Sequence, residues 1–361
     1  MKNLKLQQVQ ALPGPVLITG HTGFKGTWLT ILLERLGVSV VGYSLEPEKN
    51  SLYSKASRNG KIRETFSDIR DYQALSKFIY ESQPSAVIHM AAQPLVLESY
   101  RKPRDTFDIN VMGTVNLLDS AFENACVKAV VVVTTDKVYR NDDSGKPFIE
   151  TDPLAGKDPY SASKVGTEAA VSAWQQISKV SGGPRVVSAR AGNVIGGGDW
   201  ALERLLPDLI KSFLSGTTLS VRNPNSTRPW QHVLDPLLGY LIALEAILGE
   251  SDVSAINFGP KSESLNVSRV VEIARTAWNQ ETHVLTDITS SNNQEAQELQ
   301  LNSSYANEIL GWNPVWSQEE AVIATVNWWR KVENNKVNPL TACLEDIDKI
   351  IRLNNTTDTL S

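Results

Sequence analysis

The sequence predicts an α/β fold, a doubly wound parallel sheet with a smaller, interleaved C-terminal lobe. Three observations lead to this prediction. A glycine-rich loop directly follows an apolar segment near the N-terminus, apolar segments of strand length then alternate with segments of helix length, and this alternation ends after Asn193. Such alternation is typical of a parallel sheet that is covered by helices on both faces and binds ligands at the carboxyl ends of its strands.

The first strand–helix–strand unit shows the pattern most clearly. The apolar run at 16–19 indicates a buried strand, the glycine loop follows it, and a helix is expected over 27–36 because Gly37 can end it. The second strand is expected at 38–43. Further strands are expected at 86–90, 127–134, 185–189 and 254–258, and further helices at 106–124 and 161–181.

Composition and charge argue against several classes of protein. The chain has 361 residues, of which 41% are hydrophobic and 21% charged, as in ordinary globular proteins. Its formal net charge of -5 suggests no nucleic-acid or membrane partner, and no segment resembles a signal peptide or a membrane span. The two cysteines, Cys126 and Cys343, provide neither a disulfide framework nor metal-ligand spacing, so we expect no bound metal and a cytoplasmic location.

The loop Gly20-His21-Thr22-Gly23-Phe24-Lys25-Gly26 predicts a dinucleotide site. Its glycines follow a strand and open a helix, so the backbone can approach a pyrophosphate at the helix N-terminus. The alternative is an ordinary glycine-rich turn, which the matching strand and helix disfavour. We therefore expect the cofactor to contact Gly20, Thr22, Gly23, Phe24, Lys25 and Gly26.

The cofactor is expected to be NAD. Ser44 stands about where an aspartate usually binds the adenosine ribose, and no arginine lies immediately there for the 2'-phosphate of NADP. Asp68 and Ile69 could contact the adenine, although Asp68 could equally cap a helix. The run Ala91-Ala92-Gln93 follows a strand with small residues and suits a backbone near the nicotinamide.

These expectations divide the chain into domains. Residues 14–190, with a later return around 233–260, are expected to form an NAD-binding domain of the Rossmann type. Residues 191–232 and 261–345 are expected to form a substrate-binding lobe. Residues 346–361 are expected to be a flexible tail, because the last of them are small and polar.

Tyr160 and Lys164 predict acid–base chemistry. Because they are four residues apart they share one face of a helix, and the ammonium favours the phenolate, so the pKa of Tyr160 is expected to fall toward the range of a general base. Thr135, Asp136 and Lys137 follow an apolar strand and should point into the ligand crevice. They could polarise a substrate, donate a proton and accept one, or Asp136 and Lys137 could be only a solvated pair at a strand end.

Longer motifs accompany these residues: His89-Met90-Ala91-Ala92-Gln93-Pro94-Leu95-Val96, Asn110-Val111-Met112-Gly113-Thr114, Ala191-Gly192-Asn193-Val194-Ile195-Gly196-Gly197-Gly198-Asp199-Trp200 and Arg228-Pro229-Trp230-Gln231-His232-Val233. With the glycine loop, they make the chain resemble the extended short-chain dehydrogenases/reductases that act on nucleotide sugars, and within them the CDP-glucose 4,6-dehydratases. Lys25 and the Asp136-Lys137 pair are typical of this group, whereas related dehydratases of dTDP-glucose carry Asp-Glu at the pair.

The resemblance implies conversion of CDP-glucose to CDP-4-keto-6-deoxyglucose, a product used to make deoxysugars for surface polysaccharide such as lipopolysaccharide. Tyr160, assisted by Lys164, would take the proton of the C4 hydroxyl while NAD accepts the C4 hydride, and Thr135 would hydrogen-bond the same oxygen. Lys137 would take the C5 proton and Asp136 would protonate the departing C6 hydroxyl, before the hydride returns to C6.

Further residues are expected to bind the ligands. By resemblance, Asn110 joins the cofactor contacts. Asn193 would hold the diphosphate or the sugar. Arg204, Arg228 and His232 would contact phosphate or base, because guanidinium pairs well with phosphate oxygens; the arginines could instead form surface salt bridges. A homodimer or a homotetramer is expected, as in relatives.

Two alternatives remain at this point. The first is another nucleotide-sugar enzyme of the same fold, either a 4-epimerase or a dehydratase of a dTDP- or GDP-linked sugar. The second is a non-catalytic dinucleotide-binding sensor or scaffold. The presence of both Tyr160 and Lys164 disfavours the sensor, because such proteins often lose this pair.

Overall fold

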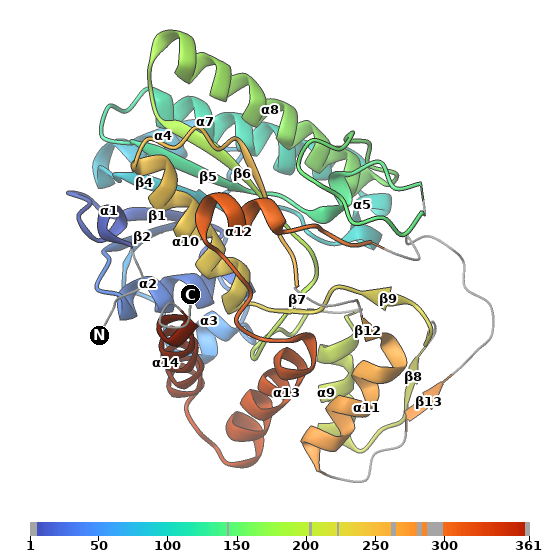
Figure 1. Cartoon of the computed structure of the whole chain (residues 1–361). Coiled ribbons are helices and arrows are strands. Elements are labelled where there is room, and N and C mark those ends of the chain that lie inside the picture. Colours follow the sequence, from blue (N-terminus) through green and yellow to red (C-terminus); the bar gives the residue numbers. More distant parts are fainter. Residues whose placement is uncertain are drawn as a thin grey trace.

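The computed structural model describes residues 6–142, 144–201, 204–221, 224–260, 265–279, 284–286 and 299–357. Its centre is a sheet of seven parallel strands in the order β11-β6-β5-β4-β1-β2-β3 (Figure 1). The strands are β1 (Val16–Thr19), β2 (Val40–Ser44), β3 (Arg63–Phe66), β4 (Ala86–His89), β5 (Ala129–Val133), β6 (Arg185–Ala191) and β11 (Ala255–Phe258). The strand order reverses between β1 and β4, and a crevice for a ligand is expected at the carboxyl ends of these two strands.

Helices cover both faces of the sheet, as Figure 1 shows. One face carries α4 (Tyr72–Ser82), α7 (Gly113–Phe122) and α8 (Pro159–Ser181), and the other carries α2 (Phe24–Arg35) and α10 (Leu234–Leu248). Side chains of β5 alternate between the two cores: Val130 and Val132 pack on the first face, and Val131 on the second. Because both faces of a buried parallel strand are covered, its sequence is a continuous apolar run.

The expected helix at 106–124 is interrupted. It consists of α6 (Pro103–Phe107), a π-helical turn over Asp108–Met112 and then α7. The sequence analysis did not predict α1 (Gln7–Gln10), α3 (Leu52–Lys55), β3, α4 or α5 (Val96–Arg101). Apart from α4 these elements are short, and short elements are held mainly by packing against distant parts of the chain.

The remaining elements lie mostly beyond the carboxyl edge of the sheet. They are β7 (Val194–Ile195), α9 (Leu205–Ser215), β8 (Leu219–Val221), β9 (Thr227–Arg228), β10 (Gln231–His232), β12 (Leu265–Asn266), α11 (Val267–Trp278), β13 (Val284–Thr286), α12 (Ser304–Leu310) and α13 (Gln318–Trp329). Between them, β11 pairs with β6 and so belongs to the main sheet. None of the helices in the described part of the chain has the length and apolar character needed to span a membrane.

The expected tail at 346–361 is wrong for most of its length. Helix α14 (Pro339–Thr357) continues through it, and Ile347 and Ile350 are fully buried. Asp348 accepts a hydrogen bond of 2.7 Å from Arg35 Nε on α2, which attaches α14 to the second face. The apolar side chains repeat at helical spacing from Cys343 onward, so burial of one helix face outweighs the polar composition of the segment.

Candidate active site

The glycine loop makes a tight turn between β1 and α2. Gly20 adopts a φ of +73°, and a Cβ there would lie 2.8 Å from the backbone nitrogen of Ala91. A Cβ at Gly26 would collide with the carbonyl oxygen of Gly20, so only glycine lets the first turn of α2 approach the loop. At Gly23, the N-cap of α2, a Cβ would meet only one atom, at 3.3 Å. The helix N-terminus is therefore accessible to a pyrophosphate, and these residues fit a bound dinucleotide.

Ser44 lies at the carboxyl end of β2, beside this loop. Thr22 Oγ1 donates a hydrogen bond to Leu45 O at 3.0 Å and lies 2.7 Å from Ser44 Oγ, so the Ser44 hydroxyl is the donor to Thr22. The pair fastens the strand end to the glycine loop. This is the place where the adenosine ribose of a dinucleotide binds in such folds.

Asp68 does not cap a helix, because Asp71 is the N-cap of α4. Asp68 accepts hydrogen bonds from Arg70 Nε at 3.0 Å and Nη2 at 2.7 Å, and these bonds lower the pKa of its carboxyl. Ile69 is buried, and its side chain packs so closely on Gly113 that a Cβ there would lie 2.6 Å from Ile69 Cγ2. Of the two predicted adenine contacts, Asp68 thus remains accessible, while the side chain of Ile69 is part of the core.

His89 at the end of β4 has a structural role. Its Nδ1 lies 2.7 Å from Thr19 Oγ1, its Nε2 lies 3.0 Å from Thr114 Oγ1, and burial lowers its pKa to about 3, so the ring is neutral. Thr114 Oγ1 donates to Asn110 O at 2.7 Å, which makes His89 Nε2 the donor and Nδ1 the acceptor. Thr19 Oγ1 in turn accepts from the backbone nitrogen of Ala91 at 3.2 Å and orients the start of the predicted cofactor loop.

Asn110 supports this loop and does not reach the crevice, which corrects its predicted role as a direct cofactor contact. It lies in the π-helical turn and is 1% exposed. Its Oδ1 accepts from Gln93 N at 2.8 Å, and its Nδ2 donates to Gln93 O at 3.1 Å and to Ser163 Oγ at 2.9 Å. Every polar atom of the amide is therefore used to join the loop at Ala91-Ala92-Gln93 to α8.

Asp136 and Lys137 lie in a short 3-10 helix over Asp136–Val138 just after β5, and Thr135 is its N-cap. Thr135 Oγ1 donates to Asp136 Oδ1 at 2.9 Å, and Lys137 Nζ donates to the same oxygen at 3.1 Å and to Asn193 Oδ1 at 3.3 Å. Asp136 is buried, while the Lys137 side chain is 28% exposed, so solvent reaches only the lysine of the pair. Among the residues that the structure describes, Asp136 Oδ2 is buried and has no hydrogen-bond partner, so this oxygen can carry a proton.

Helix α8 brings Tyr160 and Lys164 to the same strand end. Lys164 Nζ donates to the carbonyl oxygen of Val133, the last residue of β5, at 3.2 Å. Tyr160 is 8% exposed, and a hydrogen bond with Thr135 links its hydroxyl to the turn that follows β5. The structure therefore brings all five predicted catalytic residues together at one edge of the sheet.

Burial shifts the pKa values of Tyr160 and Lys164, and the shift of Tyr160 is opposite to the expected one. Burial raises the pKa of Tyr160, and the charge of Lys137 and the hydrogen bond with Thr135 only reduce this rise. Burial lowers the pKa of Lys164 to about 8, although the charge of Glu168 raises it. The expected fall in the pKa of Tyr160 is thus wrong for this structure, because the cost of burying a phenolate exceeds the attraction of the neighbouring cations.

Lys25 extends from the glycine loop into the same cluster. Its Nζ donates a hydrogen bond to Tyr240 OH at 3.0 Å. Burial, with the charges of Arg204 and Lys164, lowers the pKa of Lys25 to about 7. Tyr240 lies on α10 and is fully buried, and no motif in the sequence indicates it because the packing of α10 on the sheet decides its position.

The predicted substrate ligands fall into two groups. Asn193 receives a hydrogen bond from Lys137, and the charge of Arg204 acts on both Lys25 and Tyr160, so these two residues belong to the cluster. Arg204 Nη1 also donates to the buried carboxylate of Asp199 at 2.8 Å, and this ion pair orients the guanidinium group. Arg228 lies on β9 beside β12, where its Nη1 donates to Thr227 O at 2.8 Å, and it stays a prediction.

His232 is wrong as a predicted substrate ligand. It is fully buried, its ring packs edge-to-face on Trp316 with centroids 4.2 Å apart, and Trp28 lies on its other side at 6.0 Å. Its Nδ1 accepts from Leu234 N at 3.3 Å, and burial lowers its pKa to about 3. The polar motif at 228–233 suggested a ligand contact, but in the fold the ring of His232 packs among aromatic side chains instead.

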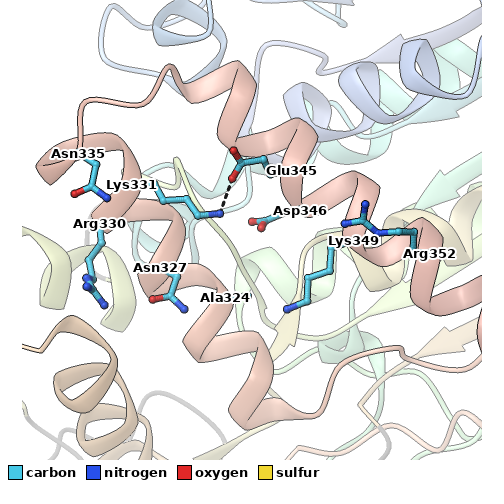
Figure 2. A pocket seen from close by; sticks show the side chains of 9 residues that line it. All are labelled: Ala324, Asn327, Arg330, Lys331, Asn335, Glu345, Asp346, Lys349 and Arg352. Carbon is cyan, nitrogen blue, oxygen red and sulfur yellow. Dashed lines mark hydrogen bonds and ion pairs between the residues drawn. The ribbon is translucent and has the colours of Figure 1, made fainter.

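A cavity of about 480 Å³ lies apart from this cluster, between α13 and α14. Figure 2 shows that Lys331 reaches Glu345 at the side of this cavity, with Nζ 2.7 Å from Oε2. Arg330 donates to Ala277 O at 2.7 Å. None of the predicted site residues lines the cavity, and at least these two of its cations are already paired within the chain.

Comparisons with known proteins agree with this geometry. Residues 17–325 match a family model described as GDP-mannose 4,6 dehydratase. The chain is 41% identical over 322 residues to CDP-glucose 4,6-dehydratase of Salmonella typhimurium, and the match covers 87% of this chain and 89% of that relative.

Solved structures show the same fold. UDP-glucose 4-epimerase of Thermus thermophilus, in complex with NAD, is 25% identical with a TM-score of 0.74, and the match covers 88% of this chain and 99% of the epimerase. A dTDP-glucose 4,6-dehydratase of Streptomyces venezuelae is 23% identical with a TM-score of 0.74, and the match covers 90% of this chain and 99% of that dehydratase. The fold class predicted from the sequence is confirmed.

Proposed function

Because the chain belongs to the family described as GDP-mannose 4,6 dehydratase, we propose that it is an NAD-dependent nucleotide-sugar 4,6-dehydratase that acts on CDP-glucose. Its relative in Salmonella typhimurium is named for this reaction, and the 41% identity extends over most of both chains. The observation that carries the proposal is the contact of Asp136 and Lys137 beside Tyr160. A 4-epimerase needs only redox chemistry at C4, whereas a dehydratase also needs an acid and a base for the loss of water.

The glycine loop at residues 20–26 would hold NAD, which would supply the acceptor for the C4 hydride and the source of the hydride at C6. Tyr160 takes the proton of the C4 hydroxyl, and Thr135 hydrogen-bonds the same oxygen from the end of β5. Lys164 favours the phenolate of Tyr160 through its positive charge. These three residues are sufficient to make a 4-ketone at the substrate.

The 4-ketone acidifies the proton at C5, and the acid–base pair then acts. Lys137 Nζ in its neutral form takes the C5 proton, and Asp136 gives a proton to the C6 oxygen, which leaves as water. Asp136 Oδ2, which has no partner among the described residues, is the atom that can carry this proton. As the hydride reaches C6, the protonated Lys137 returns a proton to C5, and the proton that Tyr160 took from the C4 hydroxyl replaces, through solvent, the one that Asp136 gave. The overall change is CDP-glucose to CDP-4-keto-6-deoxyglucose and water, with no net change in NAD.

The surroundings of the cluster suit a doubly charged diphosphate substrate. The charges of Arg204, Lys164 and Lys137 all lower the pKa of Lys25, and Asp136 is the acidic group that opposes them among the largest causes of the shift. Asn193 and Arg204 are the proposed contacts of the sugar and the diphosphate, and Arg228 is proposed for the phosphate or base. Guanidinium groups bind phosphate oxygens with two parallel hydrogen bonds, which favours arginine in this role.

We also propose that the enzyme works in the cytoplasm as a homodimer or a homotetramer and supplies deoxysugar precursors for surface polysaccharide, including lipopolysaccharide. Cys126 and Cys343 are both free thiols in the structure, which supports a reducing compartment. Size-exclusion chromatography with light scattering measures the oligomeric state directly.

A panel of CDP-, dTDP-, GDP- and UDP-glucose tests the substrate. The 4-keto-6-deoxy product should form fastest from CDP-glucose, with one solvent deuterium incorporated at C5 in heavy water. Formation of CDP-galactose without a dehydrated product would show an epimerase instead. Binding of NAD without turnover of any sugar nucleotide would favour a sensor.

A further inference from the structure

Glu168 lies one helical turn beyond Lys164 on α8, on the same face as Tyr160 and Lys164. Its carboxylate is 6% exposed and yet is fully engaged. Its Oε1 accepts from Thr134 Oγ1 at 2.5 Å and from Ser188 Oγ at 2.5 Å. A buried carboxylate is costly unless it is paired and hydrogen-bonded, so this arrangement requires several matching partners.

Arg190 on β6 supplies the opposite charge. It binds Glu168 with two hydrogen bonds, Nε to Oε1 at 2.9 Å and Nη2 to Oε2 at 2.8 Å. Its Nη1 donates to Tyr139 OH at 2.8 Å, and that hydroxyl donates to Asn257 Oδ1 on β11 at 2.7 Å. The network therefore joins α8 to three neighbouring strands of the sheet.

The network ends directly beside the reacting groups. Thr134, a donor to Glu168, precedes the catalytic Thr135, and Val133, which precedes Thr134, accepts the hydrogen bond of Lys164. Glu168 therefore bonds α8 to the strand end from which Thr135 extends. It is also the anionic group whose charge raises the pKa of Lys164 against the effect of burial.

We propose that Glu168 is a positioning residue of the dehydratase reaction: it holds α8 against the end of β5 and places a buried negative charge one helical turn from Lys164. This inference rests on the proposed function, because it assigns Glu168 to the step at C4. Arg190 compensates the charge of Glu168 and limits its effect on Lys164. Loss of either partner should therefore change the charge of Lys164 in opposite directions.

Other ionisable groups face Lys164 from the elements around it. His89 on β4 is neutral and adds no charge, while Lys25 on α2 lies near enough that the charge of Lys164 helps to lower the pKa of Lys25 to about 7. Tyr160 shares the helix. Arg190 on β6 lies behind Glu168.

Besides Lys164, which shares its helix face, other groups act on Tyr160. They are Lys137 and Asp136 after β5 and Arg204 at the start of α9. None of these is altered by a substitution at Glu168 or Arg190, so a change confined to Lys164 can be separated from them.

The test compares Glu168→Gln with Arg190→Gln in the NAD-loaded enzyme. Each variant removes one charge and keeps a polar side chain, of equal size at Glu168 and shorter at Arg190. Carbon-13 NMR of the lysine ε-carbons reports the titration of Lys164, whose resonance is identified by its absence from Lys164→Met. With Glu168→Gln the Lys164 titration and the alkaline limb of kcat should move about one pH unit lower, because Arg190 is left uncompensated. With Arg190→Gln both should move to higher pH.

Two controls keep the test informative. Arg190→Lys retains the charge and should leave the Lys164 titration near that of the wild type. The double variant Glu168→Gln/Arg190→Gln should return the Lys164 titration toward its wild-type position. Because it removes both charges together, it can be measured even when one single variant fails to fold. Shifts of both single variants in the same direction, or an unchanged Lys164 titration in Glu168→Gln, would overturn the inference. A wild type with no turnover of CDP-glucose would refute the proposed function, and the NMR titration would still decide the charge effect.

Discussion

Lys137 Nζ donates a hydrogen bond to Asp136 Oδ1 at 3.1 Å, which places the proposed base and the proposed acid of the elimination in direct contact. Lys137 Nζ also donates to Asn193 Oδ1 at 3.3 Å, so the amine is held between the carboxylate and the amide. The two groups proposed for the loss of water are therefore oriented by the same contacts.

Lys137→Ala should separate oxidation from elimination. Tyr160, Lys164 and Thr135 remain, so enzyme-bound NADH should still form with CDP-glucose, and its absorbance measures this step. Elimination and deuterium exchange at C5 should slow by roughly 10²–10⁴-fold, because one positioned acid–base group is lost. Lys128→Ala is the matched control, since Lys128 is exposed and donates to Ala125 O. Wild-type formation of the dehydrated product would remove Lys137 from the mechanism.

Tyr160→Phe should abolish turnover and leave CDP-sugar binding nearly intact. The hydroxyl contributes mainly in the transition state, so its loss lowers kcat far more than it changes substrate affinity. Calorimetry measures the affinity, and NADH absorbance after mixing measures the hydride step. Tyr80→Phe is the control because Tyr80 is 70% exposed. Substantial enzyme-bound NADH in the Tyr160 variant would contradict the assigned role.

Gly23→Ala and Gly26→Ala should have different effects. At Gly26 the added Cβ collides with the backbone at Gly20, so the variant should lose stability and fold poorly. At Gly23 the nearest atom is 3.3 Å away, so the fold should survive while the methyl group obstructs the pyrophosphate and weakens NAD binding. Thermal unfolding and calorimetry with NAD measure the two effects. Normal NAD affinity in a folded Gly23→Ala variant would show that the cofactor does not approach this position.

Asp235→Asn should stabilise the protein at high pH. Burial raises the pKa of Asp235 to about 7, so between its unfolded value and that pH the unfolded chain loses a proton that the folded chain retains. Stability therefore falls as the pH rises from about 4 to about 7, and this loss persists at higher pH. Asparagine can still accept the hydrogen bond that Val315 N donates to Oδ1 at 2.7 Å. The Tm gain should be about 2 °C or more at about pH 8 and close to zero at about pH 4; an equal gain at both would exclude the ionisation as its cause.

Local sequence accounts for much of the fold and part of the site. The apolar runs of β1, β4 and β5 and the glycines at 20, 23 and 26 specify a strand, a turn and a helix without reference to distant residues. The spacing of Tyr160 and Lys164 places them on one helix face for the same reason. Strand ends in a parallel sheet share one edge, so Thr135 could also be assigned to the crevice.

Packing between distant segments decided the rest. His232 packs against Trp28 on α2 and against Trp316, which lies just before α13. The side-chain amide of Asn110 is hydrogen-bonded to Gln93 in the loop after β4 and to Ser163 on α8. Neither residue therefore faces a ligand. Tyr240 reaches Lys25 across 215 positions of the chain, a relation that no local pattern encodes. By itself the sequence determined the alternation of the main strands and helices along the chain, the open N-terminus of α2 and the chemical types of the reacting groups, because these follow from neighbours along the chain. The tertiary structure alone decided which polar groups are buried and what charges surround them, and hence the pKa of Lys25, Tyr160 and Lys164, because burial and charge depend on residues that only folding brings together.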